Sequence, residues 1–151
     1  MSPTGGPHGN IQLAMGAELR MQGRKAGHGR AYVEVGVILW RNPDRVVAPD
    51  VCFVSARSLP LRKSSEGYLE TIPELIVEVR SKNDTVAYVN QKIADYLQAG
   101  VQLVWIVDSE TKTVTEHRRG LTTRTFTSAD SLTCPGIITD FELSVGELFA
   151  E

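Results

Sequence analysis

The middle of the chain restricts the fold more than any other part, because it contains two short apolar runs separated by a helical pattern. Residues 74–79 and residues 103–107 have the length and composition of buried strands. Between them, Asp84 or Thr85 can cap a helix that ends before Gly100. Strand, helix and strand at this spacing predict a right-handed βαβ unit with parallel strands, and therefore an α/β fold.

Two acidic residues lie within or beside apolar strands. Glu78 lies inside the run 74–79, and Asp50 follows Pro49 and leads into the apolar residues 51–54. A carboxylate in such a position is costly unless it is paired, hydrogen-bonded or bound to a cation. Two such carboxylates with basic residues nearby are what a divalent-metal phosphodiesterase site requires.

The remaining patterns predict one α/β domain over residues 1–151, with a mixed β-sheet flanked by helices and no internal repeats. Residues 1–9 are expected to form a flexible leader. Pro49 interrupts a strand pattern, which predicts an edge strand or a bulge beside Asp50. Apolar periodicity and turn residues predict a helix over 10–22 stopped by Gly23, a strand over 32–40 with a hairpin partner from Val46, a loop over 55–71, a hairpin of 114–117 with 122–127, and a short helix capped by Ser144.

The composition excludes several classes of protein. Hydrophobic residues make up 42% and charged residues 23% of the chain, as in a soluble globular protein. No apolar run approaches the roughly 18 residues that span a bilayer, and the first residues lack a signal-peptide pattern. We therefore expect a cytoplasmic protein. The formal net charge of −2 argues against non-specific coating of nucleic acid.

Basic residues are concentrated in one segment. Arg20, Arg24, Lys25 and Arg30 occur without an acidic residue between the first and the last of them. This segment is either a local basic groove or an ordinary solvated surface. The three histidines are scattered and the two cysteines do not form a CxxC motif, so a zinc site is not expected.

The residues around Glu78 could complete a site for Mg²⁺. Alternation along the strand places Arg80 on the same face as Glu78. Lys92 lies on the predicted helix beside its apolar stripe, from which a long side chain can reach the sheet edge. The alternatives stay open: Asp50 can cap a turn, and Glu78 can be an ordinary ion-pair partner of Arg80 or Lys92.

Several motifs in the correct order resemble known nucleases. Pro49-Asp50 followed by Glu78-Val79-Arg80 is similar to the PD-(D/E)XK nuclease pattern, with arginine at the lysine position. Over nearly the whole chain, the sequence resembles the Uma-two family of restriction-endonuclease-like proteins. The motifs that carry this resemblance are Ser2-Pro3-Thr4 with His8-Gly9, Pro49-Asp50, Glu78-Val79-Arg80-Ser81, Lys92-Ile93-Ala94-Asp95-Tyr96 with Gly100, Trp105-Ile106-Val107-Asp108 and Leu148-Phe149.

The resemblance implies a restriction-endonuclease-like core, a Mg²⁺ or Mn²⁺ cofactor, DNA as the substrate and a homodimer as a plausible assembly. It makes Asp50, Glu78 and the carbonyl of Val79 metal ligands. Lys92 would replace the lysine usually found two residues after the glutamate. Arg80 occupies that vacated position and, because arginine cannot act as a base, would bind phosphate.

Two features depart from the family pattern. Family members usually carry a further segment before the Ser-Pro-Thr stretch, at which this sequence begins, so a truncated or misannotated start is expected. Related nucleases often place an acid on the first helix, where Glu18 is the candidate.

Two functions therefore compete. The first is a metal-dependent endonuclease that hydrolyses phosphodiester bonds of DNA, with Asp50, Glu78, Lys92 and Arg80 as catalytic residues. The second is a catalytically inactive module on the same fold that binds nucleic acid or a protein partner. The modest charge and the displaced lysine favour the inactive module, whereas the two costly carboxylates favour the enzyme.

Overall fold

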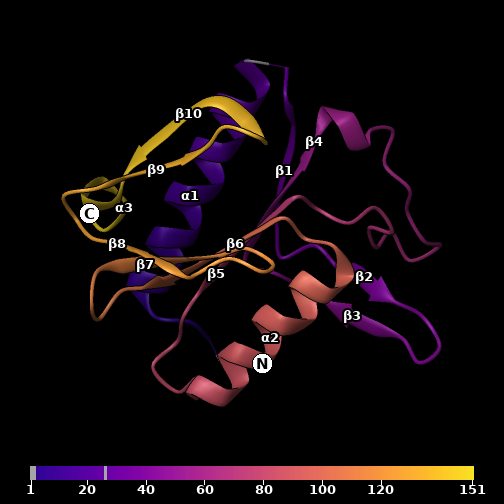
Figure 1. The fold of residues 1–151 in the computed structure, drawn as a ribbon, viewed down its shortest axis with the longest axis horizontal. Helices are drawn as coiled ribbons and strands as arrows, with labels where there is room; N and C mark the ends of the chain where they lie inside the picture. The colour runs from indigo at the N-terminus through magenta and orange to yellow at the C-terminus, as the bar shows by residue number, and fades with distance from the viewer. Residues whose placement is uncertain (1–2, 26) are drawn as a thin grey trace.

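A six-stranded mixed β-sheet forms the centre of the molecule (Figure 1). The computed structural model describes residues 3–25 and 27–151. The strand order is β1-β4-β5-β6-β7-β8, in which β5 and β6 are parallel and all other neighbours are antiparallel. The helices are α1 (Gly6–Lys25), α2 (Val86–Ala99) and α3 (Val145–Leu148), and the central strands are β1 (Gly29–Val33), β4 (Val51–Ser55), β5 (Leu75–Val79), β6 (Leu103–Asp108), β7 (Thr113–His117) and β8 (Arg124–Phe126).

Two smaller hairpins complete the fold. One consists of β2 (Val37–Trp40) and β3 (Arg45–Val47), and the other of β9 (Ser131–Cys134) and β10 (Ile138–Ser144). Figure 1 shows α1, α3 and the β9–β10 hairpin on one side of the sheet, and α2 with the β2–β3 hairpin on the other. No helix within the described ranges 3–25 and 27–151 is long and apolar enough to cross a membrane.

Side-chain alternation in β4, β5 and β6 builds two hydrophobic cores, one on each face of the sheet. Odd-numbered residues such as Phe53, Val77 and Trp105 pack with α1 and the C-terminal hairpin. Even-numbered residues such as Ile76 and Val104 pack with α2 and the β2–β3 hairpin. Because Glu78 is also even-numbered, its carboxylate lies on the α2 side.

The βαβ unit has the predicted form. The hydroxyl oxygen of Thr85 accepts a hydrogen bond from the backbone N–H of Tyr88 at 3.1 Å, which caps α2. Gly100 adopts a left-handed conformation with φ of 107° and ends the helix. The adjacent strands β5 and β6 pair in parallel from Leu75 with Leu103 onward. The predicted pairing of residues 114–117 with the following strand and the helix capped by Ser144 are also confirmed.

The expectation of one strand over residues 32–40 is wrong. The segment contains β1 and β2, which belong to different sheets, and the chain turns between them at Glu34 with φ of 52°. Pro49 accordingly lies in the connection from β3 to β4, and β4 is an inner strand flanked by β1 and β5. The predicted edge position is therefore wrong for β4, because Pro49 lies between the β2–β3 hairpin and this inner strand.

The first helix is longer at both ends than its sequence pattern predicts. Residues 6–9 were expected to be flexible but form the first turn of α1, where Pro7 is tolerated because its missing N–H would have no partner there. Residues 1 and 2 lie outside the described residues. Gly23 does not stop the helix and is buried within it. A Cβ atom at Gly23 would lie 2.5 Å from Cε2 of Phe53, so glycine allows α1 to approach the sheet.

Replacing this glycine should destabilise the fold. We expect Gly23→Ala to lower the free energy of unfolding by about 1–3 kcal/mol, because the core ring of Phe53 must move. Gly9→Ala on the same helix is the matched control, since its Cβ would meet nothing within 4 Å. The midpoint of urea denaturation is measured for both variants. Equal midpoints would contradict the close packing of Gly23 against the ring of Phe53.

Candidate active site

The strand register places the two candidate carboxylates side by side. The strands β4 and β5 pair antiparallel, with Val51 opposite Val77 and Cys52 opposite Ile76. One further step of this register puts Asp50 opposite Glu78. Residues directly opposite in an antiparallel pair have Cβ atoms about 4.5–5.5 Å apart, which is compatible with two carboxylates that share one ion.

The carboxylate of Asp50 is oriented by the backbone of β5. Its Oδ2 accepts a hydrogen bond of 2.7 Å from the N–H of Val79. His8 of α1 places Nε2 at 3.5 Å from the same oxygen. The Nε2 of Gln12 donates to the Asp50 carbonyl at 3.1 Å, so α1 also fixes the backbone there. Asp50 is thus held by α1 and β5, which meet at the start of β4.

The carboxylate of Glu78 is buried and has two partners on α2. The hydroxyl of Tyr96 donates to Oε1, and Nζ of Lys92 lies 3.6 Å from Oε2. Burial, with a smaller contribution from the nearby Asp50, raises the pKa of Glu78 to about 7, although Lys92 and the Tyr96 hydrogen bond oppose the increase. A carboxyl group with this pKa is poised to exchange its proton for a cation near neutral pH.

Lys92 is the cation nearest to Glu78 and is held in its charged form. Burial disfavours the charge, but the carboxylates of Glu78 and Asp50 and the Tyr88 side chain together raise the pKa of Lys92. Its Nζ also lies 5.1 Å from the centre of the Tyr88 ring, within the range of a cation–π contact. The helical position predicted from the sequence is therefore correct, since Lys92 reaches from α2 to the carboxylates.

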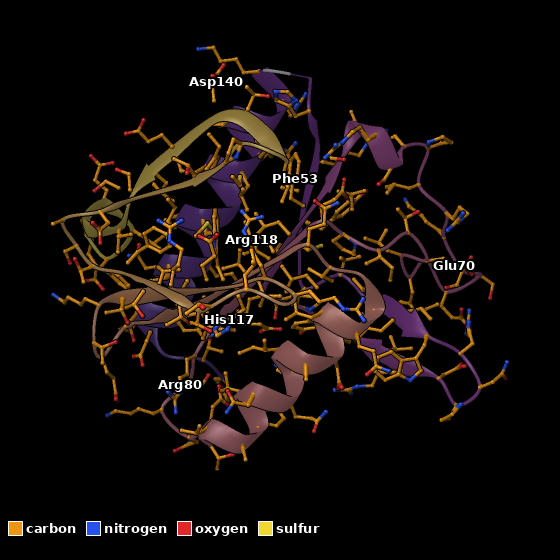
Figure 2. The ribbon with its side chains drawn as sticks, viewed as in Figure 1. Phe53, Glu70, Arg80, His117, Arg118 and Asp140 are labelled. Carbon is orange, nitrogen blue, oxygen red and sulfur yellow. The ribbon has the colours of Figure 1, made fainter. Side chains whose placement is uncertain are left out.

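Arg80 lies in the loop that leads from β5 to α2 (Figure 2) and has different partners from those expected. Its Nη1 is 3.9 Å from Oδ2 of Asp108, and its Nη2 donates to the carbonyl of Asp84 at 3.3 Å. The interpretation of Arg80 as the ion-pair partner of Glu78 is thus replaced by the Lys92–Glu78 pair. Arg80 is left partly exposed at the rim of the site.

The predicted site residues meet in one cleft of about 320 Å³. Asp50, Glu78, Val79, Arg80 and Lys92 all line it. Within residues 3–25 and 27–151, no group of three or more histidine, cysteine, aspartate or glutamate side chains is placed to hold a metal. Two carboxylates, a backbone carbonyl and open space for water nevertheless fit Mg²⁺, which usually retains several waters and needs few protein ligands.

Nearly the whole chain matches one protein family and one solved structure that are described as putative nucleases. A family model described as "Uma2: Putative restriction endonuclease" matches residues 1–146. The chain belongs to this family. A solved structure from Anabaena variabilis, titled as a putative nuclease of DUF820, is 21% identical, with a TM-score of 0.81 over 99% of this chain and 83% of that one. The likeness shows that the two proteins share a fold. No curated protein matches the chain.

The sequence did not identify two side chains of this Uma2-family cleft. Tyr96 was named as part of a motif of the family resemblance, without a role in the site, and only the fold shows its hydroxyl reaching Glu78. His8 was treated as one of three scattered histidines, yet it lines the cleft, and its buried Nδ1 is without a hydrogen-bond partner among the described residues. His8 precedes the buried residues Ile11 and Met15 by three and seven positions, a helical spacing that could have indicated its inward orientation.

Glu18 does not belong to the cleft. Its Oε2 accepts a hydrogen bond of 2.7 Å from Nε2 of Gln22, which also bonds the backbone of β10. The expected acidic contribution from the first helix is therefore wrong. The residues of α1 that approach Asp50 are His8 and Gln12, which precede Glu18 by ten and six positions and lie nearer the start of the helix.

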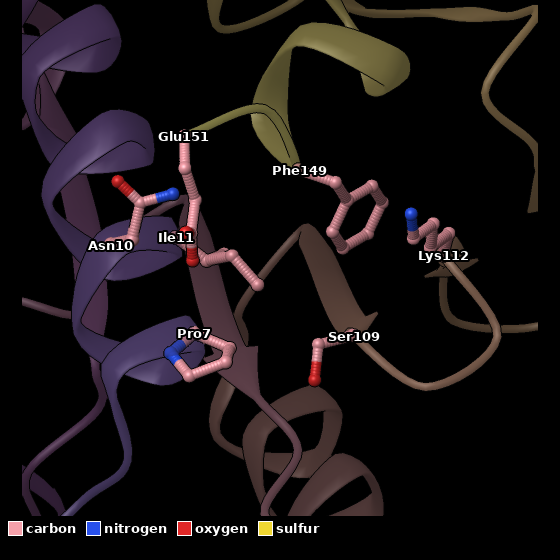
Figure 3. A pocket seen from close by; sticks show the side chains of 7 residues that line it. All are labelled: Pro7, Asn10, Ile11, Ser109, Lys112, Phe149 and Glu151. Atoms are coloured by element: carbon pink, nitrogen blue, oxygen red, sulfur yellow. The ribbon is translucent and has the colours of Figure 1, made fainter.

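A second hollow of about 370 Å³ lies between the start of α1 and the C-terminus (Figure 3). The Nδ2 of Asn10 donates to the carbonyl of Ala150 at 3.1 Å and joins the two segments. The only acidic side chain that lines it is Glu151, so it does not offer the carboxylate pair found in the cleft. Its lining residues are Pro7, Asn10, Ile11, Ser109, Lys112, Phe149 and Glu151.

Proposed function

We propose that this protein is a metal-dependent endonuclease that hydrolyses phosphodiester bonds of DNA. The observation that carries the proposal is the position of Asp50 opposite Glu78, with Lys92 at 3.6 Å from Glu78, in one cleft. Membership of a family of restriction-endonuclease-like proteins supports a nucleic-acid substrate. In this proposal the two carboxylates are retained, despite the cost of burying Glu78, because they bind a cation.

The arrangement of carboxylates and basic residues suggests a separate role for each in the proposed reaction. Asp50, Glu78 and the carbonyl of Val79 would hold Mg²⁺ or Mn²⁺, which supplies a charge that activates water and neutralises the scissile phosphate. The Val79 N–H and His8 keep Asp50 in position for this task. Lys92 remains protonated beside Glu78, so its role is to stabilise negative charge on the phosphate during attack. Arg80 at the rim can make bidentate contact with a neighbouring phosphate.

One observation favours the inactive module instead. Glu78 already has a hydroxyl donor and an ammonium partner, so its burial is compensated without a metal ion. In that case the Lys92–Glu78 pair would be structural, and the cleft would bind nucleic acid or a protein without cleaving it. A metal-binding measurement separates the two proposals.

Asp50→Asn should abolish metal-dependent stabilisation of the protein. We expect Mn²⁺ at about 100 times its dissociation constant to stabilise the wild type by about 2.7 kcal/mol, and Asp50→Asn to lose this gain because an amide is a poor metal ligand. Asparagine can still accept the hydrogen bond from the Val79 N–H, so the fold should be preserved. Thermal melting with Mn²⁺ and with EDTA measures the difference.

The control is Asp140→Asn, which removes the same charge from an exposed position far from the cleft (Figure 2). It should melt like the wild type under both conditions. In parallel, the wild type is expected to nick supercoiled plasmid DNA with Mg²⁺ or Mn²⁺ and not with EDTA. A melting temperature of the wild type that does not respond to either metal, together with intact plasmid, would leave the inactive module as the function.

A further inference from the structure

We propose that the groove between α1 and β1 binds the phosphate backbone of the substrate DNA strand on three arginines, Arg20, Arg24 and Arg30. This inference rests on the proposed function, because it assigns a path to the part of the DNA strand that extends beyond the cleft. The three arginines are those of the basic segment found in the sequence. The structure brings them to one hollow of about 380 Å³.

The residues that line the groove and the residue Glu34 of the cleft follow one another in the chain along and just after β1. Glu34, which follows β1, lines the cleft. The preceding residues 31–33 line a neighbouring hollow of about 280 Å³. Ala31 and Tyr32 also line the arginine hollow, together with Gly29 and Arg30. Consecutive residues from Arg30 to Glu34 thus lead from the arginine hollow toward the cleft that contains the carboxylates.

The length of this path suits a few nucleotides. β1 runs antiparallel to β4, so Val33 lies opposite Val51 near Asp50, and Arg30 lies opposite Val54 farther away. At about 3.3 Å per residue, Val33 and Arg30 are about 10 Å apart along the strand. On α1, Arg20 lies twelve residues beyond His8, about 18 Å along the helix axis. At a rise of about 3.4 Å per nucleotide, these lengths correspond to roughly three to five nucleotides.

The charges of the groove are not compensated within the described part of the protein. Arg20 and Arg24 are four residues apart on α1 and therefore share a helical face, and Arg30 faces the same hollow from β1. All three side chains are exposed, and none forms an ion pair within residues 3–25 and 27–151. The nearest acid on the helix, Glu18, is turned toward Gln22. Three guanidinium groups around one hollow repel one another, and a chain of phosphates relieves that repulsion.

The section of the groove between the arginines and the cleft is apolar. Leu13 and Val33 are 72% and 54% exposed, which is high for large aliphatic side chains. Gly16 lies between them, and a Cβ atom there would meet Cγ1 of Val33 at 3.3 Å, so glycine keeps the section open. Deoxyribose rings and base faces provide apolar surface between consecutive phosphates, so this section complements a nucleic-acid strand.

A second copy of the chain is the competing occupant, because β1 is an edge strand of the central sheet and edge strands can pair between molecules. A twofold contact through this groove would, however, bring the same three arginines of both copies together. Like charges at that contact would oppose association. The charge of the groove therefore favours a polyanion over a second copy.

The test is DNA binding in EDTA, which measures affinity without cleavage. Fluorescence anisotropy is recorded with a labelled 20-nucleotide single strand, the matching duplex and RNA of the same sequence, from 50 to 200 mM KCl. We expect Arg20→Gln/Arg24→Gln/Arg30→Gln to bind DNA at least 10-fold more weakly and to lower the salt slope by about 2 for the single strand. The control Arg62→Gln/Lys63→Gln/Arg119→Gln removes the same charge from other exposed positions and should bind within 2-fold of the wild type.

Each result decides the proposal. Equal binding by both triple variants overturns it, as does a wild type that binds none of the nucleic acids or prefers the RNA. Light scattering that shows a wild-type dimer and a monomeric arginine variant assigns the groove to a second copy and also overturns it. If the arginine variant loses binding while the wild type cleaves nothing with Mg²⁺ or Mn²⁺, the groove stands and the proposed nuclease function fails.

Discussion

Glu78→Gln should lower metal-dependent DNA cleavage by at least about 10³-fold while making the metal-free protein more stable above neutral pH. The loss of activity follows from the loss of a charged metal ligand on the buried strand. The gain in stability follows from the raised pKa of Glu78, which burial brings to about 7. A glutamine keeps the shape and can still accept the hydrogen bond from Tyr96.

The sign of the stability effect follows from the two pKa values of Glu78. Its folded pKa of about 7 lies above the ordinary value of 4.5, so the stabilising contribution is complete below pH 4.5 and is lost as the pH rises through 7. The difference corresponds to about 3 kcal/mol at full ionisation. The Glu78→Gln variant does not lose this stability as the pH rises, because glutamine does not ionise. Lys92 loses its partner in the variant, but its side chain is 26% exposed and can remain hydrated.

Urea unfolding in EDTA at pH 5 and pH 8.5 measures this effect. The wild type should lose stability relative to Glu78→Gln between the two pH values, whereas the exposed control Glu142→Gln should follow the wild type. Single-turnover plasmid cleavage with Mn²⁺ measures the activity. If the variant cleaved DNA at the wild-type rate, Glu78 would not be a metal ligand.

Lys92→Met should lower the rate of the chemical step by about 10²–10³-fold, whereas Arg80→Met should mainly weaken substrate binding. Lys92 lies 3.6 Å from Glu78 and is held as a cation where phosphate charge would develop. Arg80 is engaged by Asp108 and by the carbonyl of Asp84 at the rim. A contact made equally by the bound substrate and the transition state raises KM and leaves kcat nearly unchanged.

Both variants are compared by kcat and KM for an oligonucleotide duplex at pH 8.5. The high pH matters because removal of Lys92 raises the pKa of Glu78, and a protonated Glu78 would weaken metal binding by itself. Conversely, if Arg80→Met caused the larger fall in kcat, the arginine after β5 would be the cationic helper and Lys92 a structural partner.

The sequence predicted those parts of the fold that depend on local patterns. The cap at Thr85, the left-handed Gly100 and the apolar runs around them were sufficient to place α2 between β5 and β6. The region before β4 was predicted poorly. Apolar residues alternate from Tyr32 to Trp40, and periodicity alone does not show that the chain turns at Glu34 and enters a second sheet. Gly23 was taken for a helix stop because the packing of Phe53 against it has no local counterpart in the sequence.

Local sequence patterns were likewise sufficient for only part of the site. Asp50, Glu78 and Lys92 were selected from the sequence because a carboxylate in an apolar strand is costly and a lysine beside an apolar stripe can reach the sheet. Tyr96 and His8 were not selected, because a tyrosine on an amphipathic helix and a lone histidine have ordinary structural explanations. Glu18 was selected wrongly, since the helix alone does not show which part of it approaches Asp50.

The sequence by itself determined an α/β domain with a βαβ unit, two carboxylates in costly positions and the family to which the chain belongs. These properties depend on residue type and on spacing along one element. The tertiary structure decided which residues meet: the register of β4 on β5 places Asp50 opposite Glu78, and α2 gives Glu78 its partners Lys92 and Tyr96. Long-range pairing depends on the packing of two faces of a sheet at once, and no local pattern in the chain records it.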